Sequence, residues 1–297
     1  TGEFRKVAGG GSIRSTSFDG RVFALDTARF FDGDTDNLVC AFPGGQYTIE
    51  LSDDGNRCLL QPHYMNAVWL VDVRQSRFLA AREFDWFEIK DSALSPDGRR
   101  VAVALSNGEV VVLADDLVTE ICRFPGVMTS QLVWSQDGST LAASIHSNLS
   151  YVMSIPTGRV YRFLNEIRYL SSDGSRCVSA TFAWYDVASG NVLFGYALPS
   201  AVGARVLASR GPKRYLNMGY LMDFETGEVT FRPVHLPVGS SAPIAHRFDA
   251  TGKYFSDTQT IFRASDGGAQ FIYPGATFMA AIDEQAAYIR DGKAFLY

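Results

Sequence analysis

Three aspartates at alternate positions form the group of residues whose spacing comes nearest to a metal-binding motif. Asp32, Asp34 and Asp36 lie in the stretch DGDTDN, and carboxylates spaced in this way wrap Ca²⁺ in calcium-binding loops. A complete loop then requires a glycine and a final bidentate glutamate, whereas this chain has Asn37 and, further on, Pro43. Because both anchors are missing, we expect a solvated acidic turn here, with calcium binding as the alternative.

Motifs of the common catalytic classes are absent from the sequence. It contains no H-E-x-x-H zinc motif, no G-x-S-x-G nucleophile elbow and no cysteine and histidine at metal-binding spacing. The glycine-rich stretch at 9–12 leads into no helical pattern, so it lacks the helix N-terminus that binds phosphate. We therefore expect no catalytic residue, no metal and no cofactor. An enzyme whose site is assembled from distant parts of the chain stays open.

The whole sequence is built from a repeat whose clearest mark is an Asp-Gly turn. The mark reads FDG at 18–20, LSDDG at 51–55, LSPDG at 94–98, WSQDG at 134–138 and LSSDG at 170–174, and weaker copies end at Gly211, Gly252 and Gln285. Successive marks lie roughly 33 to 43 residues apart, within the range of propeller and solenoid repeats. We expect tight turns in which Gly98, Gly138 and Gly174 supply a positive φ.

Each copy of the repeat reads as four short strands. The stretch 87–124 shows this most clearly, because apolar residues alternate along 101–105 and Asn107-Gly108 then turns the chain back into 110–113. Asn-Gly between apolar runs is a strong hairpin signal. Helical periodicity is almost absent from the chain. Four strands per copy at a fixed period favour a β-propeller over a helical solenoid.

The repeats resemble the blades of WD-repeat and related bacterial β-propellers, in which the third strand ends in a hydrophobic residue followed by Asp. The corresponding pairs are Phe31-Asp32, Val71-Asp72, Ala114-Asp115, Tyr185-Asp186 and Met222-Asp223, while copies four and seven depart from the pattern with Ile155-Pro156 and Arg263-Ala264. Trp-Asp and the Gly-His dipeptide of the strict family do not occur. The resemblance implies an all-β propeller and little about function, because one architecture hosts many activities.

The two ends of the chain predict how the blades close. The last copy stops at its third strand, 294–297, and the stretch 4–7 resembles the fourth strand that it lacks. We expect the N-terminal strand to complete the last blade, which leaves no exposed sheet edge. The sequence thus predicts a single β-propeller domain over residues 1–297. It has eight four-stranded blades in this interpretation, and seven in the alternative.

Blades two to four differ from the others in the hairpin between their second and third strands. The step from the glycine mark to the WD-type position is seventeen residues in these blades and twelve in the others, including the last. We expect the five additional residues to lengthen the hairpins. In propellers of this resemblance, such hairpins share one face with the loops between blades, so that face should be raised over blades two to four.

The same face collects side chains that suit a binding surface. The hairpin tips contribute histidine, tyrosine and asparagine, and the loops between blades contribute aromatic residues and methionine. The candidate residues are His63, Tyr64, Asn66, Trp86, Phe87, Asn107, Met128, His146 and Asn148. Aromatic residues and methionine beside polar groups are typical of interface centres. A simpler interpretation, in which exposed loops merely tolerate these residues, stays open. Trp69, Trp134 and Trp184 lie in strands or at turns, and we expect them between blades in the core.

Composition sets limits on partners and compartment. The net charge of −5 gives no basic surface, which disfavours nucleic acid as a partner. No apolar run approaches the ~20 residues of a membrane span. The four cysteines show no disulfide or metal spacing, and unpaired core cysteines favour a reducing, cytoplasmic compartment. An extracytoplasmic location stays open if a signal segment has been removed.

Three functions remain. We favour a non-catalytic scaffold whose loop face over blades two to four binds a protein or peptide partner, or another domain of a longer chain. The alternatives are an extracytoplasmic propeller enzyme, of lactonase-like or quinoprotein type, and a small-ligand or glycan sensor that uses the central channel. An enzyme would need carboxylates and a histidine converging on one point, whereas a scaffold would present an exposed aromatic face.

Overall fold

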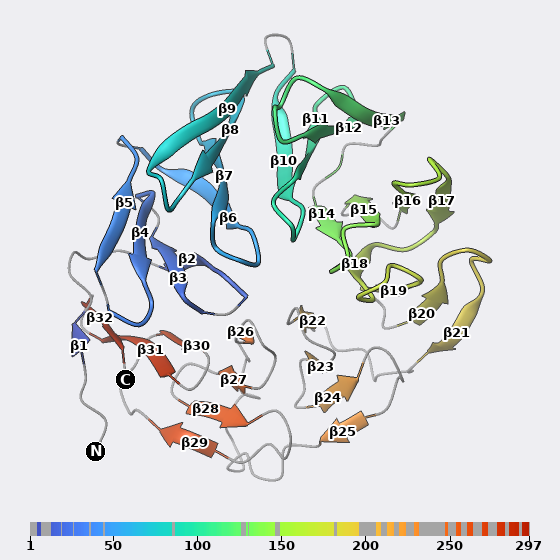
Figure 1. Ribbon diagram of the computed structural model, residues 1–297. Helices are drawn as coiled ribbons and strands as arrows, with labels where there is room; N and C mark the ends of the chain where they lie inside the picture. The colour runs from blue at the N-terminus through green and yellow to red at the C-terminus, as the bar shows by residue number, and fades with distance from the viewer. Residues whose placement is uncertain are drawn as a thin grey trace. The chain divides into compact units, whose positions relative to one another are not determined.

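The structure of the protein is a computed structural model (Figure 1). It describes residues 5–6, 13–18, 20–25, 27–35, 37–43, 45–84, 87–125, 129, 131–145, 149–180 and 183–195, and beyond these the backbone of the strands from residue 206 onward. None of the described segments forms a helix with the length and apolar character needed to cross a membrane. The chain divides into a smaller unit (Thr1–Ser12, Phe18–Gly20 and Pro199–Tyr297) and a larger unit (Ile13–Ser17 and Arg21–Leu198).

The larger unit consists of five antiparallel sheets, each with four strands paired in chain order, and we call them blades one to five. Blade one contains β2 (Ile13–Thr16), β3 (Val22–Leu25), β4 (Arg29–Asp32) and β5 (Leu38–Ala41), and blade two contains β6 (Tyr47–Leu51), β7 (Arg57–Pro62), β8 (Ala67–Asp72) and β9 (Arg77–Glu83). Blade three contains β10 (Ile89–Leu94), β11 (Arg100–Leu105), β12 (Glu109–Ala114) and β13 (Glu120–Pro125), and blade four contains β14 (Gln131–Trp134), β15 (Thr140–Ile145), β16 (Leu149–Ser154) and β17 (Val160–Phe163). Blade five contains β18 (Ile167–Leu170), β19 (Arg176–Ser179), β20 (Ala183–Asp186) and β21 (Val192–Gly195). The predicted four strands per repeat are confirmed in these five copies.

The smaller unit contains three further four-stranded antiparallel sheets. They are β22 (Val206–Ala208), β23 (Lys213–Leu216), β24 (Tyr220–Asp223) and β25 (Val229–Phe231); β26 (Arg247–Phe248), β27 (Tyr254–Ser256), β28 (Thr260–Arg263) and β29 (Ala269–Ile272); and β30 (Phe278–Ile282), β31 (Gln285–Arg290) and β32 (Lys293–Leu296) with β1 (Arg5–Lys6). In the last sheet β1 pairs antiparallel with β32, with Arg5 opposite Leu296 and Lys6 opposite Phe295. The prediction that the N-terminal strand completes the last sheet is confirmed. A single eight-bladed domain over 1–297 stays a prediction.

The Asp-Gly mark forms the same hydrogen-bonded turn in blades two to five. In blade three the Ser95 hydroxyl donates to Asp97 Oδ1 (2.5 Å) and accepts a bond from Arg100 N (2.9 Å). Asp97 Oδ1 also accepts from Arg99 N (3.0 Å), and Gly98 N donates to Ser95 O (2.8 Å). The serines Ser52, Ser135 and Ser171 make the equivalent bonds. The Ser-x-Asp-Gly repeat is therefore a turn-forming element, because its polar groups satisfy one another at the strand ends.

The glycine of this turn is required by both backbone and packing. The φ angle is +70° at Gly98, +67° at Gly138 and +69° at Gly174, which confirms the predicted turns. A Cβ on Gly98 would lie 3.0 Å from Ser52 Cβ of blade two. A Cβ on Gly174 would overlap Thr140 Oγ1 of blade four and lie 2.5 Å from its Cβ. Each turn thus stacks directly on the turn of the preceding blade.

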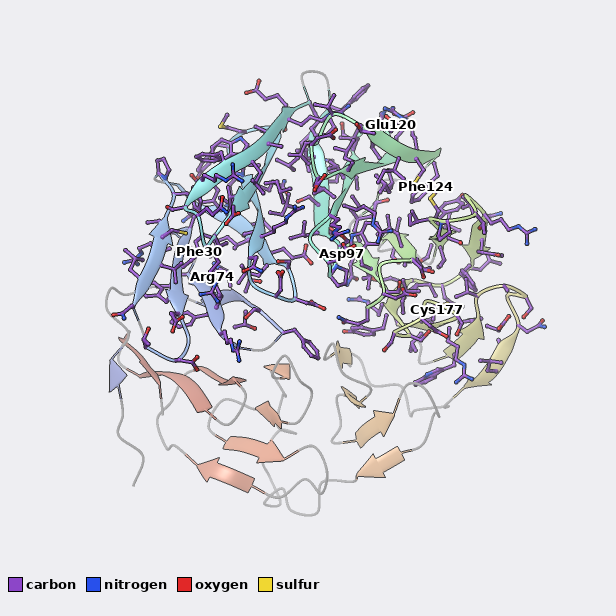
Figure 2. All side chains as sticks on the ribbon, viewed as in Figure 1. Phe30, Arg74, Asp97, Glu120, Phe124 and Cys177 are labelled. Carbon is purple, nitrogen blue, oxygen red and sulfur yellow. The ribbon has the colours of Figure 1, made fainter. Side chains whose placement is uncertain are left out.

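Neighbouring blades of the larger unit enclose the apolar core between their faces. Phe30 is buried between blades one and two, Phe124 between blades three and four, and Cys177 between blades four and five (Figure 2). The expected core positions of the tryptophans are confirmed, since Trp184 is fully buried and Trp69 and Trp134 pack against these clusters. The first strands add polar links: Leu51 N donates to Ser15 Oγ (3.0 Å), Leu94 N to Glu50 Oε2 (2.8 Å) and Leu132 N to Asp91 Oδ2 (2.7 Å).

The register of blades three and four corrects the sequence count. Asp72 of blade two lies opposite Arg57, seventeen residues after its glycine mark, but the equivalent positions in blades three and four are Ala114 and Ser154. The step there is sixteen residues, not seventeen. Asp115 lies one position further into the turn, where it forms an ion pair with Arg57 Nη1 at 2.7 Å. The count of residues along the sequence placed Asp115 at the end of the third strand, because it assumed that the Asp of the WD-type pair always ends that strand.

The additional residues of blades two to four lie mainly in the strands. β7, β8, β11, β12, β15 and β16 have six residues each, whereas β3, β4, β19 and β20 have four. Within the larger unit, the hairpins of blades two to four are therefore longer than those of blades one and five, as expected.

The repeat marks assigned near the end of the chain also need correction. Gln285 is a strand residue of β31 and lies opposite Ile282, so the turn precedes it and the step of twelve residues counted from it is wrong. In copy seven the third strand ends at Arg263, opposite Tyr254, rather than at Ala264.

The buried carboxylate of Asp91 gives a testable pH dependence. Burial raises the pKa of Asp91 from 3.8 to about 6, although hydrogen bonds from Leu132 N and Ser92 N act against the rise. The folded state therefore binds a proton more tightly than the unfolded state between about pH 4 and pH 6, and stability falls as pH rises through that window. In Asp91→Asn a neutral oxygen can still accept the bond from Leu132 N. We expect this variant to be more stable than the natural protein above about pH 6, by roughly 1–3 kcal/mol, and similar to it below pH 4.

Urea unfolding of both proteins between pH 4 and pH 8 measures this difference. A stability difference that does not change with pH would contradict the assignment of the titration to Asp91.

Candidate interaction face

Three loops of blades two and three lie at one end of their sheets. They are the β7–β8 hairpin at 63–66, the β9–β10 connection at 84–88 and the β11–β12 turn at 106–108. Phe84 N donates to Asn66 O (2.8 Å), which joins the first two loops within blade two. Ser106 N donates to Glu88 O (2.8 Å) and Glu88 N to Ser106 Oγ (3.1 Å), which joins the connection to blade three. We call these three loops the interaction face.

The described candidate residues all belong to the interaction face. His63, Tyr64, Asn66, Phe87 and Asn107 lie on its loops, and their side chains are exposed. Tyr64 is 88% exposed and Phe87 39%. The candidates Trp86, Met128, His146 and Asn148 lie outside the described residues.

Two of these polar residues have structural partners. Asn107 Nδ2 donates to Glu109 Oε2 (2.8 Å) and its Oδ1 accepts from Glu109 N (3.0 Å), so its side chain stabilises the β11–β12 turn. His63 Nε2 lies 3.5 Å from Thr48 Oγ1 of the neighbouring strand. Among the described side chains of the face, those with the largest apolar exposure are Tyr64, Phe87 and a neighbour that the sequence analysis did not select, Met65, which is 44% exposed.

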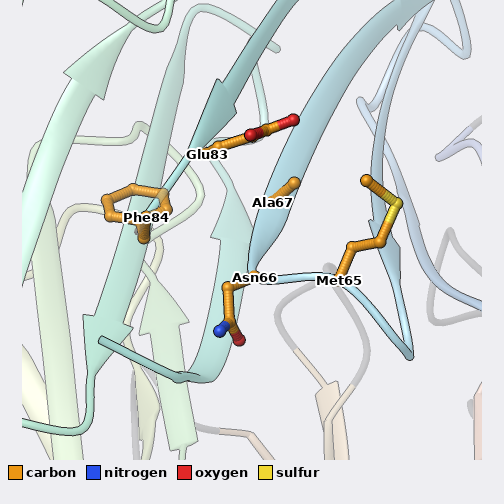
Figure 3. Close-up of a pocket in the computed structure, with 5 residues that line it drawn as sticks. All are labelled: Met65, Asn66, Ala67, Glu83 and Phe84. Atoms are coloured by element: carbon orange, nitrogen blue, oxygen red, sulfur yellow. The ribbon is translucent and has the colours of Figure 1, made fainter. Parts of the chain in front are cut away.

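A pocket of about 200 Å³ opens beside the β7–β8 hairpin and is lined by Met65, Asn66, Ala67, Glu83 and Phe84 (Figure 3). Ala67 and Glu83 are direct partners in the β8–β9 pairing, which places their side chains on the same side of the sheet. Phe84 is 8% exposed, and the Arg82 guanidinium carbon lies 5.2 Å from its ring centre. Sequence reasoning selected Asn66 and missed the other four residues. The acidic and aromatic residues of the stretch EFDWFE at 83–88 could have indicated Glu83 and Phe84, whereas no sequence signal indicated Met65 and Ala67.

At the opposite end of the sheets, aspartates accept hydrogen bonds that stabilise the turns between the third and fourth strands. Asp32 Oδ1 accepts from Asp34 N (3.2 Å), Thr35 N (3.0 Å) and Thr35 Oγ1 (2.9 Å). Burial raises the pKa of Asp32, but these bonds and the Arg74 guanidinium lower it overall. Asp186 accepts the same bonds from Ser189. This arrangement supports the interpretation of an acidic turn. Within the described ranges, no group of three or more His, Cys, Asp or Glu residues is placed to hold a metal.

Comparison with known proteins defines the fold class. No protein-family profile matches the chain, and no curated protein matches its sequence. Among solved structures, the computationally designed Ika8 protein is similar with a TM-score of 0.74 and 15% identity, over 98% of each chain. The β-propeller domain of Cps50 (Swd1) from Myceliophteria thermophila is similar with a TM-score of 0.59 and 14% identity, over 99% of each chain. With its repeated four-stranded antiparallel sheets, the protein is thus an all-β protein of the β-propeller class. At these identities the likeness extends to the fold alone.

Proposed function

We propose that the protein is a non-catalytic scaffold and that its interaction face binds a protein or peptide partner. The observation that carries the proposal is the exposure of Tyr64, Met65 and Phe87 on loops that hydrogen bonds join across two blades. Exposed apolar groups that lie together and are surrounded by polar residues mark interaction sites, whereas single exposed residues need no explanation. Aromatic residues and methionine are enriched at interface centres.

The backbone behind these side chains supports the same proposal. Two of its three loops are carried by β7, β8, β11 and β12, most of whose apolar residues are buried, among them Leu60, Val68 and Leu105. Loops on a rigid sheet lose little conformational freedom when a partner binds, so more of the contact energy appears as affinity. The similarity to the β-propeller domain of Cps50 agrees with a fold that can act as a rigid support.

We expect Tyr64→Ala and Trp86→Ala to weaken partner binding while leaving the fold intact. Tyr64 is 88% exposed, so its removal leaves no cavity, and a buried interface aromatic typically contributes about 2 kcal/mol or more to binding. The measurement is a quantitative pull-down from the native source, comparing the natural protein with the double variant. Proteins that bind through the face should be recovered at least tenfold less with the variant.

A matched control is Val118→Ala, which removes a 76% exposed apolar side chain from the turn before β13, at the other end of blade three. It should leave recovery unchanged. Equal recovery with the Tyr64 and Trp86 variant, or selective loss with Val118→Ala or with shortened loops of blade five, would place the binding site elsewhere.

A further inference from the structure

We propose that the pocket beside the β7–β8 hairpin receives the side chain of an arginine in an extended segment of the partner. The proposal rests on the proposed function and adds the chemistry of the partner. The described residues around the pocket combine apolar side chains with the carboxylate of Glu83, and the size of the pocket suits one long side chain.

The size of the pocket suits a side chain. Its volume of about 200 Å³ is smaller than the roughly 300–1,000 Å³ of typical small-molecule sites. Met65, which is 44% exposed, supplies the larger apolar surface, and it comes from the β7–β8 hairpin at the end of the sheet. An arginine or lysine side chain has an apolar stem and a charged head, so it can contact such walls while its head meets a polar group.

The charge of the pocket favours a cation. Glu83 is the single charged residue among the five that line it, and its side chain is exposed. Among the residues that the structure describes, no cation pairs with the Glu83 carboxylate, whereas Glu88 is paired with Lys90 at 2.6 Å. The stretch at 83–88 contains three acidic residues and no basic one, and the whole chain has a net charge of −5. Complementary charge of this kind steers a basic partner toward the site.

The Glu83 carboxylate favours a guanidinium over an ammonium group. The guanidinium is planar and weakly hydrated, stacks on aromatic rings and can donate two parallel bonds to one carboxylate, whereas the ammonium of lysine keeps a tightly held water shell. The Phe84 ring already accepts one guanidinium, that of Arg82, whose Nη1 donates to Leu117 O at 3.2 Å. The Phe84 ring is therefore not available to the partner: it is 8% exposed, belongs to the core between blades two and three and points away from Glu83, Ala67 and Met65 in Figure 3. The partner's guanidinium would contact Met65 and Glu83 instead.

The two loops that form the pocket also carry Tyr64 and Phe87. Tyr64 directly precedes Met65 in the first loop, and Phe87 follows Phe84 by three residues in the second. Apolar residues next to the arginine of an extended segment would therefore find exposed aromatic surface. The probes that follow are acetylated heptapeptides with arginine at the centre and leucine or tyrosine on both sides. Matched peptides carry citrulline, a neutral isostere, or lysine at the centre.

Methyl NMR of the methionine-labelled full chain gives a local readout, because the chain contains six methionines. The Met65 signal is assigned from the spectrum of Met65→Leu. We expect arginine peptides to shift the Met65 methyl signal and to leave that of Met153 unchanged, since Met153 is 2% exposed and lies between blades three and four.

Citrulline at the centre of the peptide should weaken its binding at least fivefold, and lysine about twofold to threefold. Glu83→Gln should reduce affinity for the arginine peptide about threefold to fivefold, in line with a partly exposed ion pair. The matched control Glu120→Gln, on β13, should have no effect.

Several results would overturn the arginine assignment. They are the absence of a Met65 shift with every arginine peptide, equal binding of arginine and citrulline peptides, binding of lysine as tight as that of arginine, and an unchanged affinity in Glu83→Gln. The pull-down separates this proposal from the proposed function. If Tyr64→Ala abolishes recovery of a partner that Glu83→Gln still binds fully, the result supports binding through the interaction face and contradicts the arginine pocket. If neither variant changes recovery, both proposals fail.

Discussion

Replacement of Gly174 by alanine is expected to lower the free energy of unfolding of the larger unit by about 3 kcal/mol or more. Two effects add at this position. The φ of +69° costs an alanine roughly 1–2 kcal/mol because its Cβ approaches the following carbonyl oxygen. The new Cβ would also lie 2.5 Å from Thr140 Cβ, and inserting an atom into close packing typically costs a further 1–3 kcal/mol. Thr140 is a buried strand residue, so it cannot move away freely.

Gly190→Ala is the matched control for this experiment. Its φ of +70° is nearly the same, but its added Cβ would meet no atom within 4 Å. We expect this variant to lose about 1–2 kcal/mol from backbone strain alone. Urea unfolding of both variants measures the two effects, and their difference isolates the contact between blades four and five. Equal losses of unfolding free energy in the two variants would show that the contact between Gly174 and Thr140 does not contribute to the effect.

Deletion of Thr1–Ala8 is expected to lower the midpoint of thermal unfolding of the smaller unit by several degrees and to promote aggregation. The deletion removes β1 and leaves β32 as an unpaired edge strand. Exposed edge strands template pairing with other chains. For a domain of this size a loss of 1 kcal/mol corresponds to about 2–4 °C, so differential scanning calorimetry can resolve the effect.

A point variant tests whether the pairing itself is responsible. Substituting prolines for Arg5 and Lys6 keeps the full length but removes the backbone donors of β1, and it should reproduce the deletion. Deleting only Thr1–Glu3, which precede β1, should leave the midpoint unchanged. An unchanged midpoint after the longer deletion would show that β1 does not stabilise the sheet.

Local chemistry explains which parts of the fold could be predicted from the sequence. The Ser-x-Asp-Gly turn depends on residues within six positions of one another, so its repetition marked the strands correctly from Ser52 to Arg176. The end of the third strand in blade three could not be located in this way, because Ala114 lies opposite Arg100 and Asp115 lies in the turn, where it pairs with Arg57 of blade two. Leu117 shows the same effect, since it adopts a φ of +56° and its buried side chain packs with residues of blade two. No local pattern reveals such partners.

The candidate site, like the fold, could be predicted from the sequence only in part. Counting along the hairpins selected Tyr64, and the connection between blades two and three supplied Phe87; both are exposed on the interaction face, because loop position alone determines their location. The pocket was missed because Glu83 and Ala67 are brought together by the β8–β9 pairing, sixteen residues apart in the chain. Selection of Asn107 by residue type was less informative, since its hydrogen bonds are used within its own turn.

The pairing of β1 with β32 also determines how the protein responds to a mechanical pull on its two ends. Because the strands are antiparallel, the segment before Arg5 and the segment after Leu296 leave the ladder at the same end. A force applied there separates Arg5 from Leu296 first and Lys6 from Phe295 next, so the backbone bonds are loaded one after another rather than together. This geometry opens at a lower force than one in which both pairs are sheared at once. Any tension that attached segments place on the chain would therefore detach β1 before it reaches the longer hairpins of blades two to four.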